Sequence, residues 1–451
     1  MSSSKIIFLS LVGTIIIGIL IAFWMLSRNS DSTSTVEKGS LTVWIVGDTT
    51  EGYDTLTTGF HEYAPEYKNI SITFKKFSDY ASYQKILLST LADQKGPDIF
   101  MVDAGADNIL RDKVEPIPSE YINTSDFAKR FDDIFLPLLE SSGSTKSATT
   151  YLRGVPLGYE TLGIFYNKSL LVNIPRTWND ISAMYTDGAS PDIFPVNIGM
   201  TPRYTPYATD IIGLFLLQDG SESYTELGSY EKSIRDYLSY GYSSILGSQE
   251  GDAKTLNEME NTLSASKFTT LDLFIRGQIA FVIGYPSMIQ ELEDAKKRAG
   301  TEAINSIVLT EKIPQKSNGS NGTNIAKYRY FGLSKTSQNS LLGAKFLDYL
   351  LTEDAEKRFL EAFPLYIPAQ RAFYESAQDT VLSNIFSRAK LDSFIPSVNQ
   401  TLQTFDYGNK IEFEKILWDN IDRNGKIDTN NIIKLFESSI GCEITTEKCE
   451  K

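Results

Sequence analysis

The sequence predicts an α/β protein with two lobes, preceded by an N-terminal transmembrane helix. The chain has 451 residues, which is too long for one ordinary domain and suits two. Strand-like apolar runs alternate with helical patterns, as in doubly wound α/β folds. The uncharged run from Ile6 to Leu26 is long enough to cross the roughly 30 Å hydrocarbon core of a bilayer.

The N-terminal segment is expected to hold the chain on the cell membrane as a single-pass anchor. The bulky residues Phe23 to Leu26 stand where a cleaved signal peptide needs small ones, so an uncleaved anchor is favoured over cleavage. No cysteine follows the segment that could carry a lipid. Ser27 to Ser40 is rich in Ser and Thr and predicts a flexible tether to an extracytoplasmic soluble domain.

Composition argues against several classes of function. The formal charge of −14 opposes binding to nucleic acid, whose affinity comes from neutralising phosphates. The single histidine, His61, lies in an amphipathic helical pattern, and no nucleophile elbow, phosphate loop or metal cluster accompanies it. We therefore expect no enzyme activity, no cofactor and no metal site. Cys442 and Cys449 could form a local disulfide or stay as free thiols.

One stretch imitates a calcium-binding loop. Asn420 to Asn431 carries Asp422, Gly425 and Asp428 at the spacing of an EF-hand. The twelfth position is Asn431, which cannot supply the bidentate carboxylate that closes such a site. A helix end, a turn and a new helix explain the same residues, and this interpretation is preferred over a calcium site.

In the first half of the chain, acidic residues follow two apolar strands. Leu41 to Val46 leads to Asp48, and Asp98 to Val102 leads to Asp103. A helical pattern separates each strand from the next, which gives β–α–β order. Ligands of such sheets bind beyond the carboxyl ends of the strands. Asp48 and Asp103 are therefore candidate ligand contacts, although either could instead cap the helix that follows.

A second unit begins near Gly154. Val155 to Tyr166 is strand-like and contains Tyr159 and Glu160. A carboxylate there would be costly unless it faces a solvated cleft or an arginine such as Arg153. Gln278 to Gly284 predicts a buried strand with Tyr285 at its carboxyl end. Tyr159 and Tyr285 could be platforms for a sugar ring or aromatic residues of the core.

Helix starts and short strands complete the pattern. Thr177 with Asp180, and Ser287 with Gln290, have the spacing of capping boxes. Lys316 to Asn324 predicts a loop before a short strand from Tyr328 to Leu333. Two helices, Ala344 to Leu351 and Thr352 to Phe363, precede an extended crossing from Pro364 to Pro368, and Trp44 and Trp178 are assigned to packing.

Five segments in this order resemble the bacterial ABC-transporter extracellular solute-binding proteins of the carbohydrate type, family 1, which are similar to maltose-binding protein. The segments are Leu41–Asp48 (LTVWIVGD), Gly96–Phe100 (GPDIF), Gly154–Lys168 (GVPLGYETLGIFYNK) with Pro175–Trp178 (PRTW), Gly277–Pro286 (GQIAFVIGYP) and Ala344–Leu351 (AKFLDYLL). The resemblance spans about Leu41 to Ser438.

The resemblance implies a periplasmic-binding-protein-like fold of type II, with hinge crossovers near Pro156, Ile304 and Pro364. After the anchor and linker of residues 1–39, lobe I is expected to comprise residues 40–156 and 305–363. Lobe II is expected to comprise residues 157–304 and 364–451.

The resemblance also implies ligand contacts in the cleft between the lobes. The family's cleft positions match Asp48, Asp103 and Glu160, and the region of Tyr204 and Tyr207 resembles another cleft segment. Ser287 stands where the family often has a tryptophan, and Tyr285 is the nearest aromatic residue. Aromatic rings beside carboxylates suit a carbohydrate.

The expected function follows from these points. The chain would be a monomeric receptor that binds a small polar ligand, a mono- or oligosaccharide, and delivers it to ABC permease subunits in the membrane. The alternative is a membrane-tethered sensor or adhesion module with the same fold.

Overall fold

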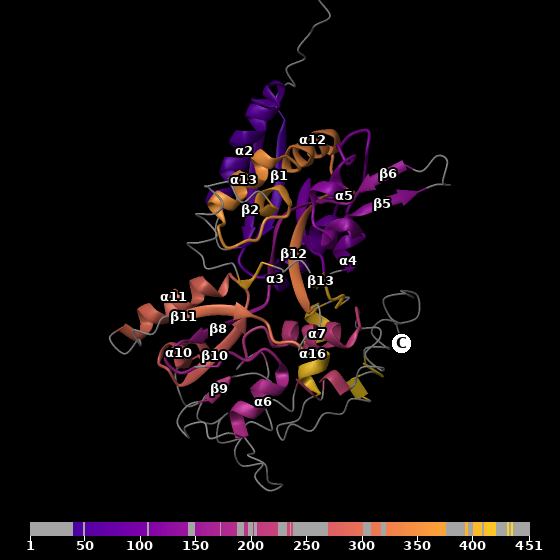
Figure 1. Ribbon diagram of the computed structural model, residues 1–451. Coiled ribbons are helices and arrows are strands. Elements are labelled where there is room, and N and C mark those ends of the chain that lie inside the picture. Colours follow the sequence, from indigo (N-terminus) through magenta and orange to yellow (C-terminus); the bar gives the residue numbers. More distant parts are fainter. Residues whose placement is uncertain are drawn as a thin grey trace, which may run out of the picture.

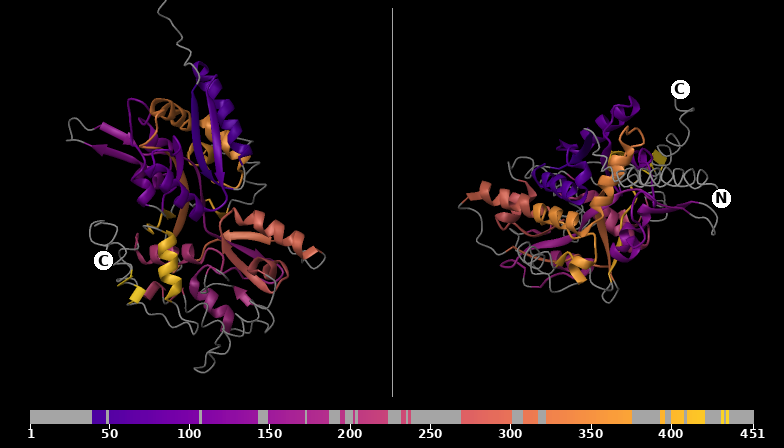
Figure 2. Two further views of the ribbon diagram at one scale, coloured as in Figure 1. Left: turned by 180° about the vertical axis from the view of Figure 1, so that it is seen from behind. Right: turned by 90° about the horizontal axis from the view of Figure 1, so that it is seen from above.

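The protein consists of two bodies joined by β-strands. A computed structural model describes residues 39–47, 50–105, 108–142, 149–171, 173–186, 194–196, 202, 205–223, 232–234, 236–237, 269–300, 308–316, 322–375, 393–395, 400–407, 410–420, 431–432 and 434–435. Figure 1 shows one body above the other, and the view from behind in Figure 2 also shows two separate bodies. We call the upper body lobe I and the lower body lobe II.

Lobe I is built on a mixed sheet in the order β13-β12-β3-β1-β2, with β7 paired to β12. Its strands are β1 (Ser40–Val46), β2 (Ser71–Phe77), β3 (Ile99–Asp103), β7 (Val155–Thr161), β12 (Thr323–Leu333) and β13 (Thr401–Gln403). β1 runs parallel to both β2 and β3, so their carboxyl ends meet at one edge. The predicted β–α–β order of this region is confirmed.

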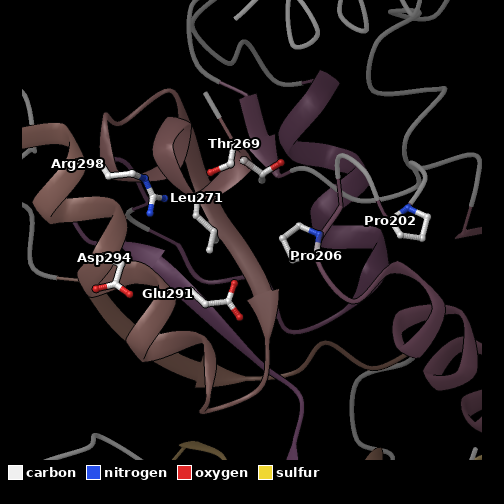
Figure 3. A pocket seen from close by; sticks show the side chains of 8 residues that line it. Pro202, Pro206, Thr269, Leu271, Glu291, Asp294 and Arg298 are labelled. Carbon is white, nitrogen blue, oxygen red and sulfur yellow. The ribbon is translucent and has the colours of Figure 1, made fainter. Parts of the chain in front are cut away.

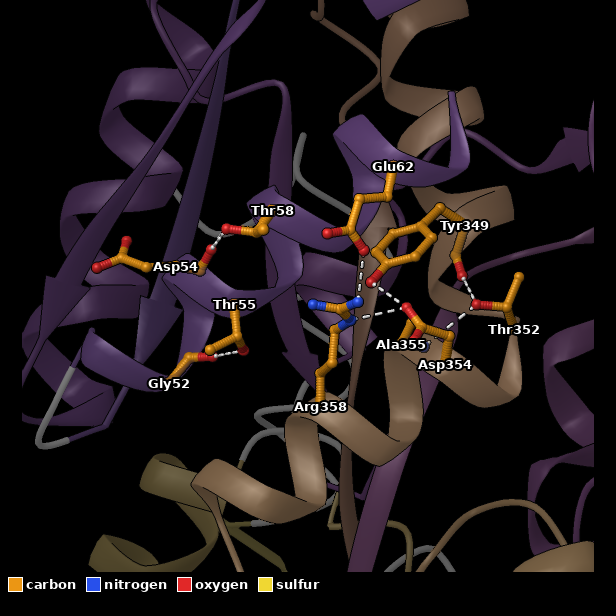
Figure 4. A network of polar contacts seen from close by, with 10 residues as sticks. All are labelled: Gly52, Asp54, Thr55, Thr58, Glu62, Tyr349, Thr352, Asp354, Ala355 and Arg358. Atoms are coloured by element: carbon orange, nitrogen blue, oxygen red, sulfur yellow. Dashed lines mark hydrogen bonds and ion pairs between the residues drawn. The ribbon is translucent and has the colours of Figure 1, made fainter. Parts of the chain in front are cut away.

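Four helices pack around this sheet: α2 (Glu51–Tyr63), α3 (Tyr80–Ala92), α12 (Ser340–Leu350) and α13 (Glu353–Ala362). Figure 4 shows how α13 is tied to α2 and α12. Arg358 forms ion pairs with Glu62 at 2.6 Å and Asp354 at 2.8 Å, and the Tyr349 hydroxyl donates to Asp354. Helices far apart in the sequence thereby form one layer.

Shorter elements complete lobe I. They are η1 (Pro65–Tyr67), α4 (Asn108–Arg111), α5 (Phe127–Arg130), η2 (Asp133–Leu138) and α14 (Ala372–Glu375), together with a small sheet of β4 (Ile117–Pro118), β5 (Leu139–Ser142) and β6 (Thr149–Leu152).

Lobe II has its own sheet in the order β11-β8-β10-β9. The elements of this lobe are β8 (Gly163–Asn167), β9 (Phe194–Val196), β10 (Ile279–Gly284), β11 (Val308–Lys312), α6 (Trp178–Thr186), α7 (Ala208–Asp219), α10 (Thr270–Ile275), α11 (Met288–Ala299) and α16 (Lys410–Asp419). The first ten residues of α7 are all buried, which fits its nearly continuous apolar sequence.

Two strands carry the chain between the lobes. β7 pairs with β12 in the first sheet, and after Leu162 the chain enters β8 of the second sheet. β12 also contacts α7 of lobe II. Near the third predicted crossover, Ile367 exchanges backbone hydrogen bonds with Tyr159. The residue near the second, Ile304, lies outside the described residues. The expected lobe boundaries stay predictions, although β11 lies in the lobe II sheet and β13 in the lobe I sheet, opposite to the expected division.

Local signals in the sequence were right in some places and wrong in others. Thr177 and Asp180 form the expected capping box, with reciprocal hydrogen bonds of 3.2 and 2.9 Å. Ser287 does precede α11, but its side chain makes no capping bond. The strand predicted from Tyr328 begins earlier, at Thr323, because Asn324 and Ile325 are buried and paired with β13. Trp44 and Trp178 are buried, as predicted.

Candidate functional site

Asp103 is the last residue of β3 and lies at the carboxyl edge of the lobe I sheet. Its register partner on β12 is Arg329, whose Nε is 3.8 Å from Oδ2 of Asp103. The backbone N–H of Gly105 donates to the other carboxylate oxygen at 3.4 Å. Asp48, the second predicted residue at this edge, lies outside the described residues.

Arg329 brings a cation to the edge of the sheet beside an aromatic ring. Its guanidinium lies 5.9 Å from the ring centre of Tyr80. Burial alone would lower the pKa of Arg329, but the nearby Asp103 carboxylate and tyrosines raise it above its ordinary value. Its buried Nε has no hydrogen-bond acceptor among the described residues.

Glu160 is buried, and its charge is compensated by the N-terminal end of a helix. Its carboxylate accepts a hydrogen bond of 2.8 Å from the backbone N–H of Ser287, which precedes α11. Helix N-termini carry partial positive charge, so a carboxylate there is stabilised. Arg153, the partner considered from the sequence, instead pairs with Glu140.

A lysine and two tyrosines form a cluster beside Glu160. The rings of Tyr207 and Tyr285 meet edge to face at 5.1 Å. Nζ of Lys327 lies 4.9 Å from the ring centre of Tyr285 and 5.8 Å from that of Tyr207. These distances indicate cation–π contacts. Tyr207 adopts a left-handed conformation with φ of 55° and donates its hydroxyl to Glu291 at 3.2 Å.

Tyr285 is fully buried, and its hydroxyl has no hydrogen-bond partner among the described residues. Burial, together with the nearby carboxylate of Asp210, raises the pKa of Tyr285 well above its usual value. The hydroxyl therefore stays protonated and able to donate.

A small cavity of about 20 Å³ lies at the lobe junction and is lined in part by Lys327. Asp103 lines it from lobe I, and Tyr285, Asp210 and Lys410 line it from lobe II. Asp210 is 4% exposed and forms an ion pair with Lys410. Burial alone would raise the pKa of Asp210, but Lys410 and Lys327 hold it below its ordinary value. The cavity is large enough for one water molecule.

Tyr159 faces the other way from its neighbour Glu160. Its ring is fully buried and packs edge-on against Phe135 of lobe I at 5.8 Å. Successive residues of a strand point to opposite faces, so Glu160 alone of the two turns toward the cluster. Tyr204 lies outside the described residues. The structure therefore brings Asp103, Glu160 and Tyr285 to one region and places the ring of Tyr159 in the core.

Sequence reasoning missed four charged residues of this region: Arg329, Lys327, Asp210 and Lys410. For Lys327 and Arg329 a signal existed, because they alternate with Ala326, Tyr328 and Tyr330 in a strand that is otherwise largely apolar. For Asp210 and Lys410, which are 200 positions apart, no local pattern indicates the pair.

A larger pocket of about 370 Å³ lies on lobe II and is shown in Figure 3. Glu291, Asp294 and Arg298 of α11 line one side, while Thr269, Thr270 and Leu271 near the start of α10 and Pro202 and Pro206 line the rest. Glu291 also accepts the hydroxyl of Tyr207 and so links this pocket to the cluster. Its volume falls within the range of about 300–1,000 Å³ usual for ligand pockets.

Several expectations depend on residues that the structure does not describe. Ile6–Leu26, Cys442 with Cys449, and residues 421–430 of the calcium-like loop all lie outside the described part. At the ends of that loop, Nδ2 of Asn431 donates to Oδ1 of Asn420 at 2.8 Å. Within the described residues, no His, Cys, Asp and Glu side chains gather in a group of three that could hold a metal ion. No helix within those residues is long and apolar enough to span a membrane.

Comparison with solved structures supports the two-lobed α/β fold. An ABC substrate-binding protein from Listeria monocytogenes, solved in complex with cycloalternan, superposes with a TM-score of 0.64 at 14% sequence identity, over 90% of this chain and 99% of that chain. The sugar-binding protein MalE from Xanthomonas citri gives a TM-score of 0.62 at 17% identity, over 91% of this chain and 100% of that chain. The predicted two-lobed fold of solute-binding proteins is confirmed.

Comparison with characterised sequences identifies the family. A maltooligosaccharide ABC transporter solute-binding lipoprotein from Streptococcus pneumoniae strain R6 is 22% identical over 96% of each chain. The sequence model of the bacterial extracellular solute-binding proteins matches residues 60–382, well over half of this chain. These proteins bind solutes and are not enzymes, which confirms the expectation that the chain catalyses no reaction. The protein belongs to the family of bacterial extracellular solute-binding proteins, as its sequence motifs predicted.

Proposed function

We propose that this protein is the receptor of an ABC importer and that it binds a carbohydrate, a mono- or oligosaccharide, where its two lobes meet. The observation that carries the proposal is the convergence of Asp103 of lobe I with Glu160, Tyr207 and Tyr285. Carboxylates accept hydrogen bonds from sugar hydroxyls, and aromatic side chains contact the apolar faces of sugar rings. The maltooligosaccharide-binding relative supports the same ligand class.

The ligand contacts are proposed to come from both lobes. Lobe I would contribute contacts from Asp103, Arg329 and Tyr80. Glu160 and Lys327 would contribute contacts from the two strands that join the lobes. Asp48 and Tyr204, which lie outside the described residues, remain proposed ligand contacts on the basis of the sequence. The rings of Tyr159 and Tyr285 are fully buried, which favours packing beneath the site over stacking on the ligand, while Tyr285 still lines the cavity at the junction. Ligand bound by groups of both lobes would stabilise the closed form.

We further propose that the receptor works as a monomer at the outer face of the cell membrane and delivers its ligand to a permease. The relative from Streptococcus pneumoniae is named a lipoprotein, whereas the two cysteines of this chain stand at positions 442 and 449. The apolar run Ile6–Leu26 would therefore hold the chain in the membrane itself.

A thermal-shift screen of the full chain in detergent tests the ligand class. Sugars, amino acids and short peptides are compared, because a ligand that binds only the folded state stabilises it by about 2.7 kcal/mol at one hundred times its Kd. We expect a saccharide to raise the melting temperature and Asp103→Asn and Glu160→Gln to reduce that shift. Asp112→Asn, at an exposed position, should leave it unchanged. Stabilisation by peptides or amino acids alone would contradict the proposal.

A further inference from the structure

We propose that the sugar bound by this protein carries an anionic group, a carboxylate or a phosphate, which pairs with Lys327 at the lobe junction. The inference rests on the proposed function and narrows its ligand class. It follows from which charged groups of the site have partners within the chain and which do not.

Three carboxylates of the site have cationic or N–H partners, and a fourth, Glu291, accepts the hydroxyl of Tyr207. Asp103 lies beside Arg329 and accepts from Gly105 N–H. Asp210 is ion-paired with Lys410, and Glu160 accepts from the N–H of Ser287. The charges of Asp103, Asp210 and Glu160 are therefore compensated without a ligand.

Lys327 differs from these groups. It is half-buried, and among the described residues it has neither a hydrogen bond nor an ion pair; its ammonium faces only the rings of Tyr285 and Tyr207. Glu160 is its register partner on β7, yet the Glu160 carboxylate is held by Ser287 instead. Asp210, the other carboxylate acting on Lys327, is already paired with Lys410. The Lys327 ammonium is therefore partly desolvated and has no hydrogen-bonded counter-charge. This state is unfavourable unless an anion binds.

The remaining unused polar atoms at the junction, the hydroxyls of Tyr285 and Thr404 and Nε of Arg329, can all donate a hydrogen bond. Tyr285, whose hydroxyl has no partner among the described residues, lines the same cavity as Lys327 and Thr404, and Nε of Arg329 has no hydrogen-bond acceptor there. A sugar hydroxyl can accept from such donors but brings a proton of its own, for which the hydroxyl oxygens of Tyr285 and Thr404 are the unused acceptors. A carboxylate or phosphate oxygen only accepts, so it fits an array of donors better.

The test compares matched acidic and neutral sugars by isothermal titration calorimetry on the full chain in detergent. Glucuronate and glucose 6-phosphate are each measured against glucose, and trigalacturonate against α-1,4-galactotriose. We expect at least one acidic sugar to bind ten times more tightly than its neutral match or better. Comparing the affinities of the carboxylate-bearing and phosphate-bearing sugars shows which of the two anions the site binds.

Variants at Lys327 separate the effect of its charge on binding from any effect on folding. Lys327→Met keeps the length of the side chain without its charge and should reduce the acid preference at least tenfold, whereas Lys327→Arg should retain most of it. Lys335→Met removes the same charge from an exposed turn and should change nothing. Thermal unfolding of each variant shows that it is folded.

The outcomes distinguish the inference from the function on which it rests. Equal or tighter binding of the neutral sugars, or an acid preference that survives Lys327→Met, would overturn the inference and leave the saccharide receptor intact. If no saccharide of either kind binds while another solute does, the proposed function itself fails, and the inference fails with it.

Discussion

Replacing Glu356 with glutamine should change how the stability of this protein depends on pH. Glu356 belongs to α13, and its side chain is fully buried. One carboxyl oxygen accepts from the N–H groups of Ala369 and Gln370 at 2.5 and 3.0 Å, while the other has no partner among the described residues. Burial raises the pKa of Glu356 from 4.5 to about 8, and the hydrogen bonds and Arg130 offset this only in part.

The sign and size of the effect follow from this pKa. Between pH 4.5 and 8 the folded protein holds a proton that the unfolded chain has already released, so the free energy of unfolding falls as pH rises through that window. At about 1.36 kcal/mol per pKa unit, the full loss is on the order of 5 kcal/mol. Glutamine keeps the accepting oxygen and cannot ionise, so Glu356→Gln should escape this loss.

The measurement is the melting temperature of both proteins at pH 5.5 and at pH 8.5. The advantage of Glu356→Gln over the wild type should grow by about 10 °C between these values, since about 1 kcal/mol shifts the melting temperature of a lobe of this size by 2–4 °C. Glu361→Gln, at an exposed position of the same helix, corrects for general effects of charge. An advantage that stays constant, or grows toward acid pH, would refute the reasoning.

Two further substitutions test the framework of the site. Asp98→Ala should lower the free energy of unfolding by about 3 kcal/mol, because the carboxylate accepts from Thr42 N–H and Oγ1 and from Nδ2 of Asn339; a loss below about 1 kcal/mol in urea unfolding would contradict this. Gly105→Ala should cost about 1–3 kcal/mol and weaken ligand binding, because its Cβ would lie 2.6 Å from the carbonyl oxygen of Phe405. Gly47→Ala, which meets nothing within 4 Å, is the control, and equal effects of the two substitutions would refute the steric argument.

Sequence patterns were sufficient where neighbours along the chain decide the structure. The apolar run before Gly47 forms β1, and the Thr177 to Asp180 spacing forms a helix cap, because both depend on residues a few positions apart. Asp103 at the end of β3 follows from the same reasoning, since parallel strands present their carboxyl ends at one edge.

Contacts between distant segments were decided only by the tertiary structure. Glu160 meets the N–H of Ser287 across 127 positions, which local spacing could not indicate, and it occupies the N–H that Gln290 would accept from in the expected capping box. Lys327, the register partner of Glu160, contacts the rings of Tyr285 and Tyr207 and forms no ion pair among the described residues. The sequence by itself determined the elements, through local periodicity and caps, while the partners of the buried charges were decided by packing between segments that lie far apart along the chain.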